Sequence, residues 1–179
     1  MTCVVGLVNK GRLYMGVDSA AVSGWTRRTS ELSKVFRRGP FLIGYTTSFR
    51  MGQLLEHELA VPPQQAGVSD MSYMVSTFIE SARKLFKERG FTQIESNKEK
   101  GGQFLVGFKG TLYSVESDFQ VGHMSDGYDA VGSGSDFALG AMAALERLPP
   151  QRRVRRALEI AAHFSMGVCG PFHIKSMRS

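Results

Sequence analysis

Short turns centred on glycine join apolar segments in pairs, and this pairing most constrains the fold. Residues 3–8 and 12–17 flank Asn9-Lys10-Gly11, and residues 33–38 and 40–47 flank Gly39. A third pair, 103–109 and 111–117, flanks Gly110. Strands joined by such short turns are antiparallel neighbours. The sequence therefore predicts three hairpins rather than a parallel sheet.

Helical segments separate these hairpins. In residues 70–89, Met74, Phe78, Ala82 and Leu85 recur at helical spacing. The polar stretch 91–101 is expected to be a mobile loop. Further helices are expected after Ser48, over 136–147 and over 152–164, with a last strand over 172–176. This order lacks βαβ alternation and predicts an αββα sandwich, two antiparallel sheets flanked by helices.

Composition indicates a soluble protein with one domain over residues 1–179. The chain is 42% hydrophobic and 21% charged, which is typical of globular proteins. The apolar start at 3–8 is too short for a signal peptide, and no run approaches the roughly 18 apolar residues of a membrane span. Cys3 and Cys169 have no CxxC spacing, so reduced thiols and a cytoplasmic setting are expected.

A basic cluster stands near the C-terminal end of the chain, which carries a net charge of +6. Weak attraction to polyanions is compatible with that charge. No aromatic residues are interleaved with the arginines, so nucleic acid is not expected as a partner, and a solvated helix face is the simpler interpretation. The cluster consists of Arg152, Arg153, Arg155 and Arg156.

Thr2 precedes the first apolar segment, and an N-terminal threonine can be a nucleophile. Its own α-amine, with a pKa near 8, can accept the hydroxyl proton through a water. This chemistry requires removal of Met1. Most chains that begin Met-Thr are not hydrolases, so Thr2 alone decides nothing.

A cation near Thr2 would favour both the alkoxide and the neutral amine. Lys34 shares a strand face with Leu32 and Phe36, and a lysine on an apolar face needs a partner, for which Asp18 is a candidate. The alternative is a lysine at a strand edge.

Two further positions, one a glycine and one a serine between glycines, could serve acyl transfer. Gly44 lies inside a predicted strand, where its N–H could face an oxyanion or where it could simply admit a large neighbour. Ser133 lies in the sequence Gly-Ser-Gly-Ser before a predicted helix, which is either an anion-binding loop or a capped turn.

Together these segments resemble the proteasome β-subunit family, and most closely its bacterial branch, the protease that works with the HslU unfoldase. The resemblance covers nearly the whole chain. Asp18 and Lys34 stand sixteen and thirty-two residues after Thr2, which is the family's spacing. The matching segments are TCVV at the start, GVDSAAVSG, SKVFRR, FLIG, LYSVES and AVGSGSDFALGAM.

The resemblance implies the N-terminal-nucleophile hydrolase fold and a set of roles. Thr2 would be the nucleophile, Lys34 would lower the proton affinity of its hydroxyl and amine, and Asp18 would hold Lys34. Gly44 would supply the oxyanion N–H, and Ser133 would bond near the amine. The pocket for the residue before the cut would favour apolar side chains and would be lined by Ala21, Leu32, Phe36 and Leu42.

The chain departs from the proteasome pattern near its end. Proteasome subunits carry a supporting Asp and Ser there, whereas HFSMGVCG offers Met166 and Cys169, as expected for the bacterial branch, which also lacks that pair. The chemistry needs no cofactor. The branch's carbonyl-lined site for a monovalent cation would fall at Ala162, Ser165 and Val168. Gly44 is followed by Tyr-Thr-Thr, where relatives carry smaller residues.

The first hypothesis is therefore a threonine peptidase. It would form stacked homo-oligomeric rings, receive unfolded protein from an AAA+ unfoldase and need no membrane. One alternative is a non-peptidase amidohydrolase of the same fold. Another is a catalytically silent ring subunit or scaffold that retains Met1.

Overall fold

The computed structural model describes residues 1–178 and contains two antiparallel sheets that face each other. The four-stranded sheet has the order β12 (Tyr128–Val131), β1 (Val4–Asn9), β2 (Arg12–Val17) and β13 (His173–Arg178). The five-stranded sheet has the order β11 (Val121–Gly122), β10 (Thr111–Val115), β9 (Phe104–Phe108), β6 (Phe41–Tyr45) and β5 (Val35–Arg38).

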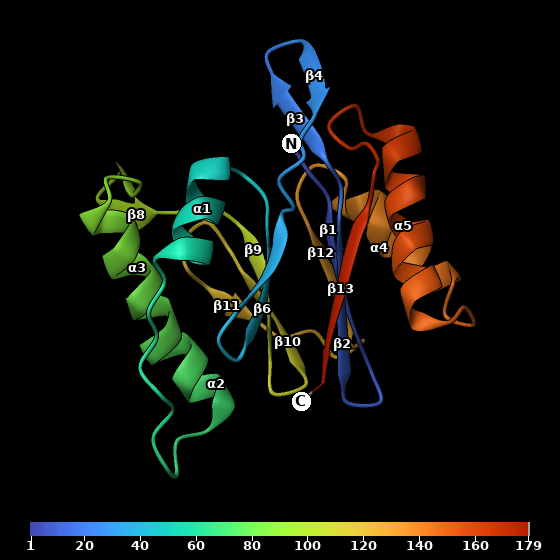
Figure 1. Ribbon diagram of the computed structural model, residues 1–179. Coiled ribbons are helices and arrows are strands. Elements are labelled where there is room, and N and C mark those ends of the chain that lie inside the picture. Colours follow the sequence, from blue (N-terminus) through green and yellow to red (C-terminus); the bar gives the residue numbers. More distant parts are fainter. Residues whose placement is uncertain (179) are drawn as a thin grey trace.

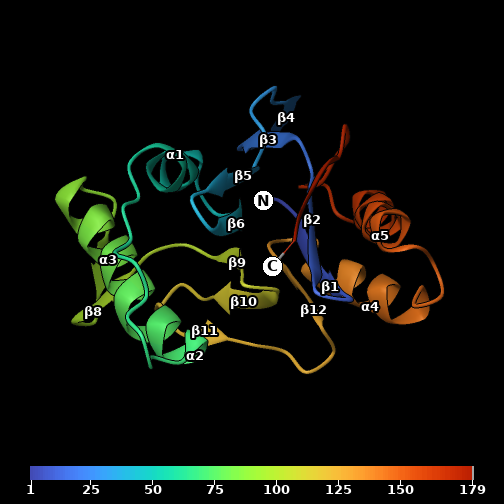
Figure 2. The same cartoon turned by 60° about the horizontal axis from the view of Figure 1, so that its bottom comes forward.

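Helices cover the outer face of each sheet (Figures 1 and 2). The four-stranded sheet is covered by α4 (Ser135–Ala144) and α5 (Pro150–Phe164). The other side carries α1 (Phe49–His57) and one long helix made of α2 (Asp70–Tyr73), a π-helical turn η1 (Met74–Phe78) and α3 (Ile79–Glu88). The predicted αββα sandwich is confirmed.

Three cores hold the layers together, and they differ in composition. The core under α1 and α3 is aromatic, with Phe41 stacked on Phe108 at 5.0 Å between ring centroids. The core under α4 and α5 uses small residues such as Ala138 and Ala161. The core between the sheets is mainly aliphatic, and glycines such as Gly44 let the sheets approach closely.

Local signals account for most element boundaries. The Ser48 hydroxyl accepts the Arg50 N–H and so caps α1, as a serine at this position should. The long helix is capped by Ser69, through the Ser72 N–H. The turns at Lys10-Gly11 and Lys109-Gly110 have positive φ at both residues, which matches the twist of a tight hairpin.

Two further hairpins were not expected. The pair β3 (Ala20–Ser23) and β4 (Thr26–Thr29) projects beside the N-terminus (Figure 1). The polar stretch predicted to be a mobile loop instead contains the hairpin of β7 (Gln93–Glu95) and β8 (Lys98–Lys100). Both are mainly polar, so they lack the apolar alternation by which a strand is recognised.

None of the helices within residues 1–178 is long and apolar enough to cross a bilayer.

Candidate active site

Strand pairing brings four distant segments together at one end of the sandwich. Val4 of β1 lies opposite Val17 of β2 and opposite Val131 of β12. The start of β1 therefore lies beside the ends of both neighbouring strands. Thr2 precedes β1, Asp18 follows β2, Ser133 follows β12, and Lys34 precedes β5 in the other sheet.

Lys34 is the centre of this cluster. Its ammonium donates hydrogen bonds to Thr2 Oγ1 (2.9 Å), Asp18 Oδ1 (2.9 Å) and the Ala20 carbonyl (2.7 Å). The three acceptors use all three N–H groups of the ammonium. Lys34 is only 1% exposed and Asp18 is fully buried. A fully bonded buried ammonium is thus held directly against the threonine hydroxyl.

The Asp18 carboxylate is held as firmly as the lysine. Oδ1 also accepts the Cys3 N–H (3.1 Å), while Oδ2 accepts the N–H groups of Ala20 (2.7 Å) and Cys169 (3.4 Å). These hydrogen bonds fix the orientation of the carboxylate toward Lys34. The loop before β13 therefore contributes to the site through the Cys169 backbone.

Burial shifts the pKa values of Lys34 and Cys3 in opposite directions. Desolvation lowers the pKa of the Lys34 ammonium, and the Asp18 charge and hydrogen bond counteract that change. Desolvation raises the pKa of the Cys3 thiol, and the Asp18 charge raises it further. Cys3 therefore remains a protonated thiol and is a poor nucleophile.

Ser133 and Met1 lie on the other side of Thr2. The Thr2 N–H donates to Ser133 Oγ (3.2 Å), and the Ser133 hydroxyl lies 3.4 Å from the Thr2 carbonyl. The Thr2 hydroxyl donates to the Met1 carbonyl. With Met1 attached, the Thr2 nitrogen is a peptide nitrogen without a basic lone pair. The site therefore has a base only once the Met1–Thr2 bond is cut.

The geometry does not support the oxyanion role expected of Gly44. Strands β5 and β9 flank this residue on both sides, opposite Val35 and Leu105. The next N–H, that of Tyr45, donates to the Lys34 carbonyl on the β5 side (3.0 Å), so the Gly44 N–H faces β9. The reason for glycine is packing, since a Cβ there would lie 2.6 Å from Met15 Sδ.

Thr47, which the sequence did not single out, is better placed. It follows β6 with a φ of 69°, a strained conformation for a β-branched residue. The Gln103 N–H donates to its hydroxyl (3.1 Å), and within residues 1–178 the Thr47 N–H itself donates no hydrogen bond. The neighbouring Thr46 hydroxyl and the Thr2 carbonyl both lie against Gly132. Thr47, whose N–H has no partner among the described residues, therefore directly follows a residue that lies, like Thr2, against Gly132.

The four residues predicted to line a substrate pocket divide into two pairs. Ala21 in β3 is partly exposed, and Leu32, before β5, is 59% exposed. Phe36 and Leu42 are buried in the aromatic and inter-sheet cores. The latter two side chains are core residues, so their assignment to the pocket is corrected. Alternation along the strands could not show which layer each face meets.

The predicted cation site lies at the end of α5. Ala162 is in the last turn of the helix, Ser165 follows its end, and Val168 lies in the next turn. The Ser165 carbonyl accepts the Val168 N–H (3.1 Å), which leaves one lone pair for another partner. A carbonyl-bound cation at these residues remains a prediction.

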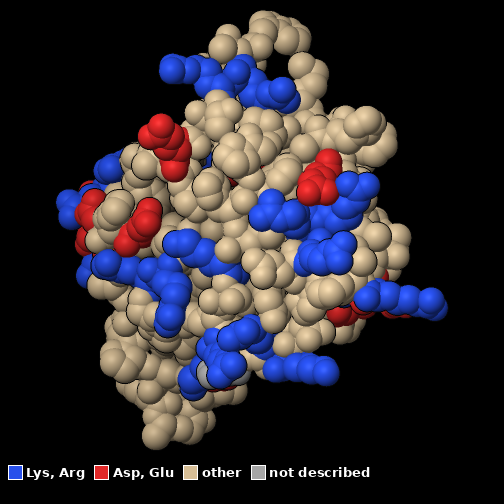
Figure 3. Space-filling model, turned by 45° about the vertical axis from the view of Figure 1, so that its right-hand side comes forward, with Lys and Arg blue, Asp and Glu red and all other residues tan. Residues whose placement is uncertain are grey.

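The arginine cluster lies on the outer face of α5, where Lys and Arg predominate over Asp and Glu (Figure 3). Arg152, Arg155 and Arg156 are exposed, and Arg156 pairs with Glu159 at 2.9 Å. Arg153 instead donates to the Met142 carbonyl and packs over Tyr128, so it ties α5 to α4 and to β12.

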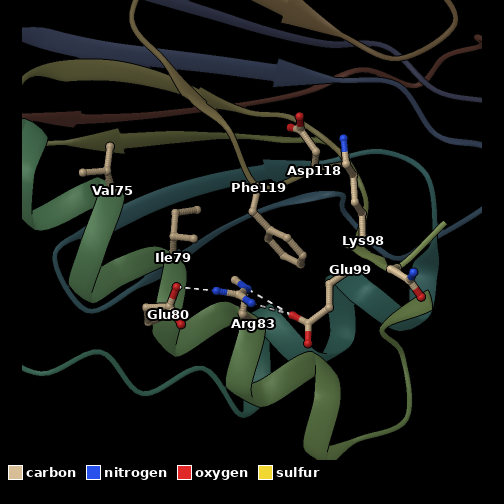
Figure 4. A pocket seen from close by; sticks show the side chains of 9 residues that line it. Val75, Ile79, Glu80, Arg83, Lys98, Glu99, Asp118 and Phe119 are labelled. Atoms are coloured by element: carbon tan, nitrogen blue, oxygen red, sulfur yellow. Dashed lines mark hydrogen bonds and ion pairs between the residues drawn. The ribbon is translucent and has the colours of Figure 1, made fainter. Parts of the chain in front are cut away.

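A separate hollow of about 640 Å³ lies at α3 and the β7–β8 hairpin (Figure 4). Arg83 crosses it, pairs with Glu80 and Glu99, and packs against the Phe119 ring. The charged residues of the hollow are partly or fully exposed, and they are three acidic ones, Glu80, Glu99 and Asp118, and two basic ones, Arg83 and Lys98. None of the residues of the Thr2 cluster lines this hollow.

The two facing sheets and their covering helices define the fold, which is the proteasome β-type fold also found in N-terminal-nucleophile hydrolases. Solved structures share this fold over nearly the whole chain. BPH from Thiobacillus denitrificans, in complex with epoxomicin, matches with a TM-score of 0.79 and 23% identity over 98% of both chains. Eukaryotic HslV from Trypanosoma brucei matches with a TM-score of 0.72 and 16% identity over 99% of both.

A more distant match shows how widely this fold is shared. Anbu, the ancestral β-subunit from Yersinia bercovieri, has a TM-score of 0.67 and 12% identity, over 99% of this chain and 82% of its own. No protein-family model and no curated protein matches the sequence. At these identities the likeness establishes the fold, and the chemistry has to be argued from the residues.

Proposed function

We propose that this chain is a threonine peptidase that hydrolyses peptide bonds with Thr2 after removal of Met1. One observation carries the proposal: a buried, fully hydrogen-bonded Lys34 ammonium lies 2.9 Å from Thr2 Oγ1. A buried ammonium stabilises a neighbouring alkoxide and disfavours protonation of a neighbouring amine. Both effects favour attack by an N-terminal threonine.

Acylation begins with the free Thr2 amine. The amine takes the hydroxyl proton through a water, and Oγ1 attacks the carbonyl carbon of the substrate peptide. The C–N bond of the tetrahedral intermediate then breaks, and the proton on the amine goes to the leaving nitrogen. The products are an ester on Thr2 and a shortened peptide with a new amino terminus.

Deacylation repeats these steps with water. The Thr2 amine takes a proton from a water, whose oxygen attacks the ester carbon, and the C–Oγ1 bond breaks. The proton returns to Oγ1 and the acid product leaves. Asp18 holds the Lys34 ammonium throughout, and Ser133 orients the amine through its hydroxyl.

The oxyanion donor in this proposal is the Thr47 N–H in place of that of Gly44. A strained loop that leaves a donor unpaired matches what an oxyanion site needs, because the donor costs no reorganisation during the reaction. The hydrogen bond from Gln103 to the Thr47 hydroxyl holds the loop in position.

The proposal extends to assembly and delivery. We expect stacked homo-oligomeric rings that receive unfolded polypeptide from an HslU-like AAA+ unfoldase, in keeping with the likeness to HslV. We also expect a cytoplasmic location, in keeping with Cys3 and Cys169 being free thiols. Sedimentation and electron microscopy of the purified protein test for rings.

Intact-mass spectrometry with epoxomicin, the ligand in the BPH structure, tests the chemistry. A ketone beside an epoxide can react with both the hydroxyl and the amine of one threonine. The expected species lacks one methionine and gains one adduct. Thr2→Ala should lose the adduct and peptide hydrolysis, whereas Thr2→Ser should retain part of both. Hydrolysis that persists in Thr2→Ala would refute the proposed nucleophile.

A retained Met1 would favour one of the alternatives, a silent ring subunit. Its side chain packs against Gly167: a Cβ added to Gly167 would lie 2.4 Å from Met1 Cβ. A retained methionine therefore contacts the turn after α5. Full-length mass and no adduct would support that alternative. Hydrolysis of small amides but not of peptides would instead support the non-peptidase amidohydrolase.

A further inference from the structure

An aromatic ring lies beside the buried ammonium. The Lys34 Nζ sits over the face of Phe49, 5.7 Å from the ring centroid. Phe49 is the first residue of α1, directly after the capping Ser48, and it is partly buried. Its ring meets Tyr45 edge-on at 6.3 Å, so the aromatic core fixes its orientation.

This contact is additional to the hydrogen bonds of the ammonium. All three N–H groups already donate to Thr2, Asp18 and Ala20. The ring therefore acts through its electron-rich face, which attracts a cation within about 6 Å, most strongly where water is excluded. With only 1% of Lys34 exposed, water offers the charge almost no competing solvation.

We propose that Phe49 is a positioning residue whose ring face keeps the Lys34 ammonium charged and directed at Thr2 Oγ1. The proposal deepens the proposed peptidase function and rests on it for its kinetic consequence. Phe49 would act through Lys34 and would form no bond to the reacting atoms.

Several groups besides the Phe49 ring influence the pKa of Lys34. Burial lowers the lysine pKa, while the charge of Asp18 and its hydrogen bond act to raise it. After removal of Met1, the Thr2 amine is a further titratable group on the residue whose hydroxyl accepts a hydrogen bond from Lys34. Tyr45, beneath Phe49, stays a neutral phenol because burial raises its pKa to about 12. Loss of the ring face removes one stabilising contribution to the cation, so the Lys34 pKa should fall.

The decisive variants keep the apolar volume and change the ring. Phe49→Leu removes the aromatic face but still covers the lysine, and Phe49→Tyr keeps the face. Phe91→Leu is the matched control, because Phe91 packs on Phe86 near the end of α3. The lysine pKa is measured by NMR on protein with ¹³C-labelled lysine side chains, and Lys34→Arg assigns the signal.

In Phe49→Leu we expect the Lys34 proton affinity to fall about threefold, with little change in Phe49→Tyr and Phe91→Leu. The alkaline limb of kcat/KM for a peptide should move to lower pH by the same factor. An unchanged lysine pKa in Phe49→Leu would overturn the proposal, as would an equal loss in Phe49→Tyr. A loss of kcat/KM that is the same at every pH would also overturn it, because that indicates general disruption.

The two readouts separate this proposal from the peptidase function. The lysine titration does not require activity, so it tests the ring even if the protein cleaves no peptide. Absence of hydrolysis with a shifted pKa would refute the function and leave the Phe49–Lys34 contact established. Hydrolysis with no pKa shift would support the peptidase function and refute the proposed role of Phe49.

Discussion

Two groups of ion pairs in this molecule use similar residues under opposite conditions. At the Thr2 cluster, Lys34 and Asp18 are 1% and 0% exposed and every polar atom of the ammonium has a partner. At the α3 hollow, Arg83 pairs with Glu80 and Glu99, with exposures of 36%, 62% and 23%. Both groups have short contacts, yet only the first is withdrawn from water.

The difference shows why short contacts and a large hollow are poor guides to a reactive site. Exposed pairs are screened and contribute about 0.2–1 kcal/mol each. A buried pair interacts more strongly, but each of its charges depends on the other to offset desolvation. The predictions below test this contrast, from the largest expected effect to the smallest.

Replacing Lys34 by Met should give the largest effect. Peptide hydrolysis should fall by about 10³-fold, since the hydroxyl loses its stabilising charge. The free energy of unfolding should fall by about 3–5 kcal/mol, because Asp18 is left as a buried charge without its cation. Urea unfolding and kcat/KM check both. Lys34→Met/Asp18→Asn should regain stability but not activity, and no regain would contradict this account of the pair.

Ser133→Ala should affect activity more than stability. The hydroxyl is the partner of the Thr2 nitrogen, and Ser133 is exposed. We expect kcat/KM to fall about 10- to 100-fold, as for the loss of a group that orients a reacting atom, with less than about 1 kcal/mol lost from the free energy of unfolding. Ser135→Ala, in the same loop, is the control. Equal losses in both variants would indicate that the loop is merely sensitive to change.

Alkaline pH should reduce activity by about tenfold per pH unit once Lys34 loses its proton. The lowered pKa places this limb below 10.5, the ordinary value for lysine. Between the folded and unfolded pKa values the unfolded chain binds more protons, so Lys34 itself adds stability as pH rises through this window. Activity and circular dichroism measured against pH should therefore separate. A loss of fold at the same pH would contradict the prediction.

Arg83→Ala should give the smallest effect. Its ion pairs are exposed, so we expect about 0.5–1 kcal/mol of lost stability, part of it from the contact with Phe119. Added salt at 1 M should abolish most of the difference between variant and parent. The same salt should leave the loss in Lys34→Met largely unchanged. If the loss of stability in Arg83→Ala did not depend on salt, the ion pairs of Arg83 would behave like the buried Lys34–Asp18 pair, and the contrast would fail.

The sequence predicted the fold and the residues that the structure brings to Thr2, because spacing along paired strands determines which residues meet. Thr2, Asp18 and Lys34 stand at strand ends, and those ends converge once the hairpins form. The proposed oxyanion donor, the Thr47 N–H, could not be found from strand spacing. Gly44 had a visible signal for close backbone approach, but the approaching atoms belong to Met15.

The features that could not be predicted from the sequence depend on backbone geometry and on contacts between distant segments. The positive φ of Thr47 occurs at a residue type that avoids it, so no propensity indicates it. The contact of Phe49 with Lys34 crosses from a helix start to another segment. Phe36 and Leu42 show the converse failure: both are apolar strand residues, but each faces a core instead of a pocket.

The sequence separation of the site's parts bears on when activity can arise during synthesis. Thr2 is made well before its hydrogen-bond partner Ser133, which comes 131 residues later, and the Cys169 N–H comes 151 residues after Asp18. A nascent or broken chain therefore carries the threonine without its surroundings. In the proposed peptidase, a copy that ends before Ser133 or Cys169 therefore lacks part of the site, and cutting is expected to begin only after both segments have been made.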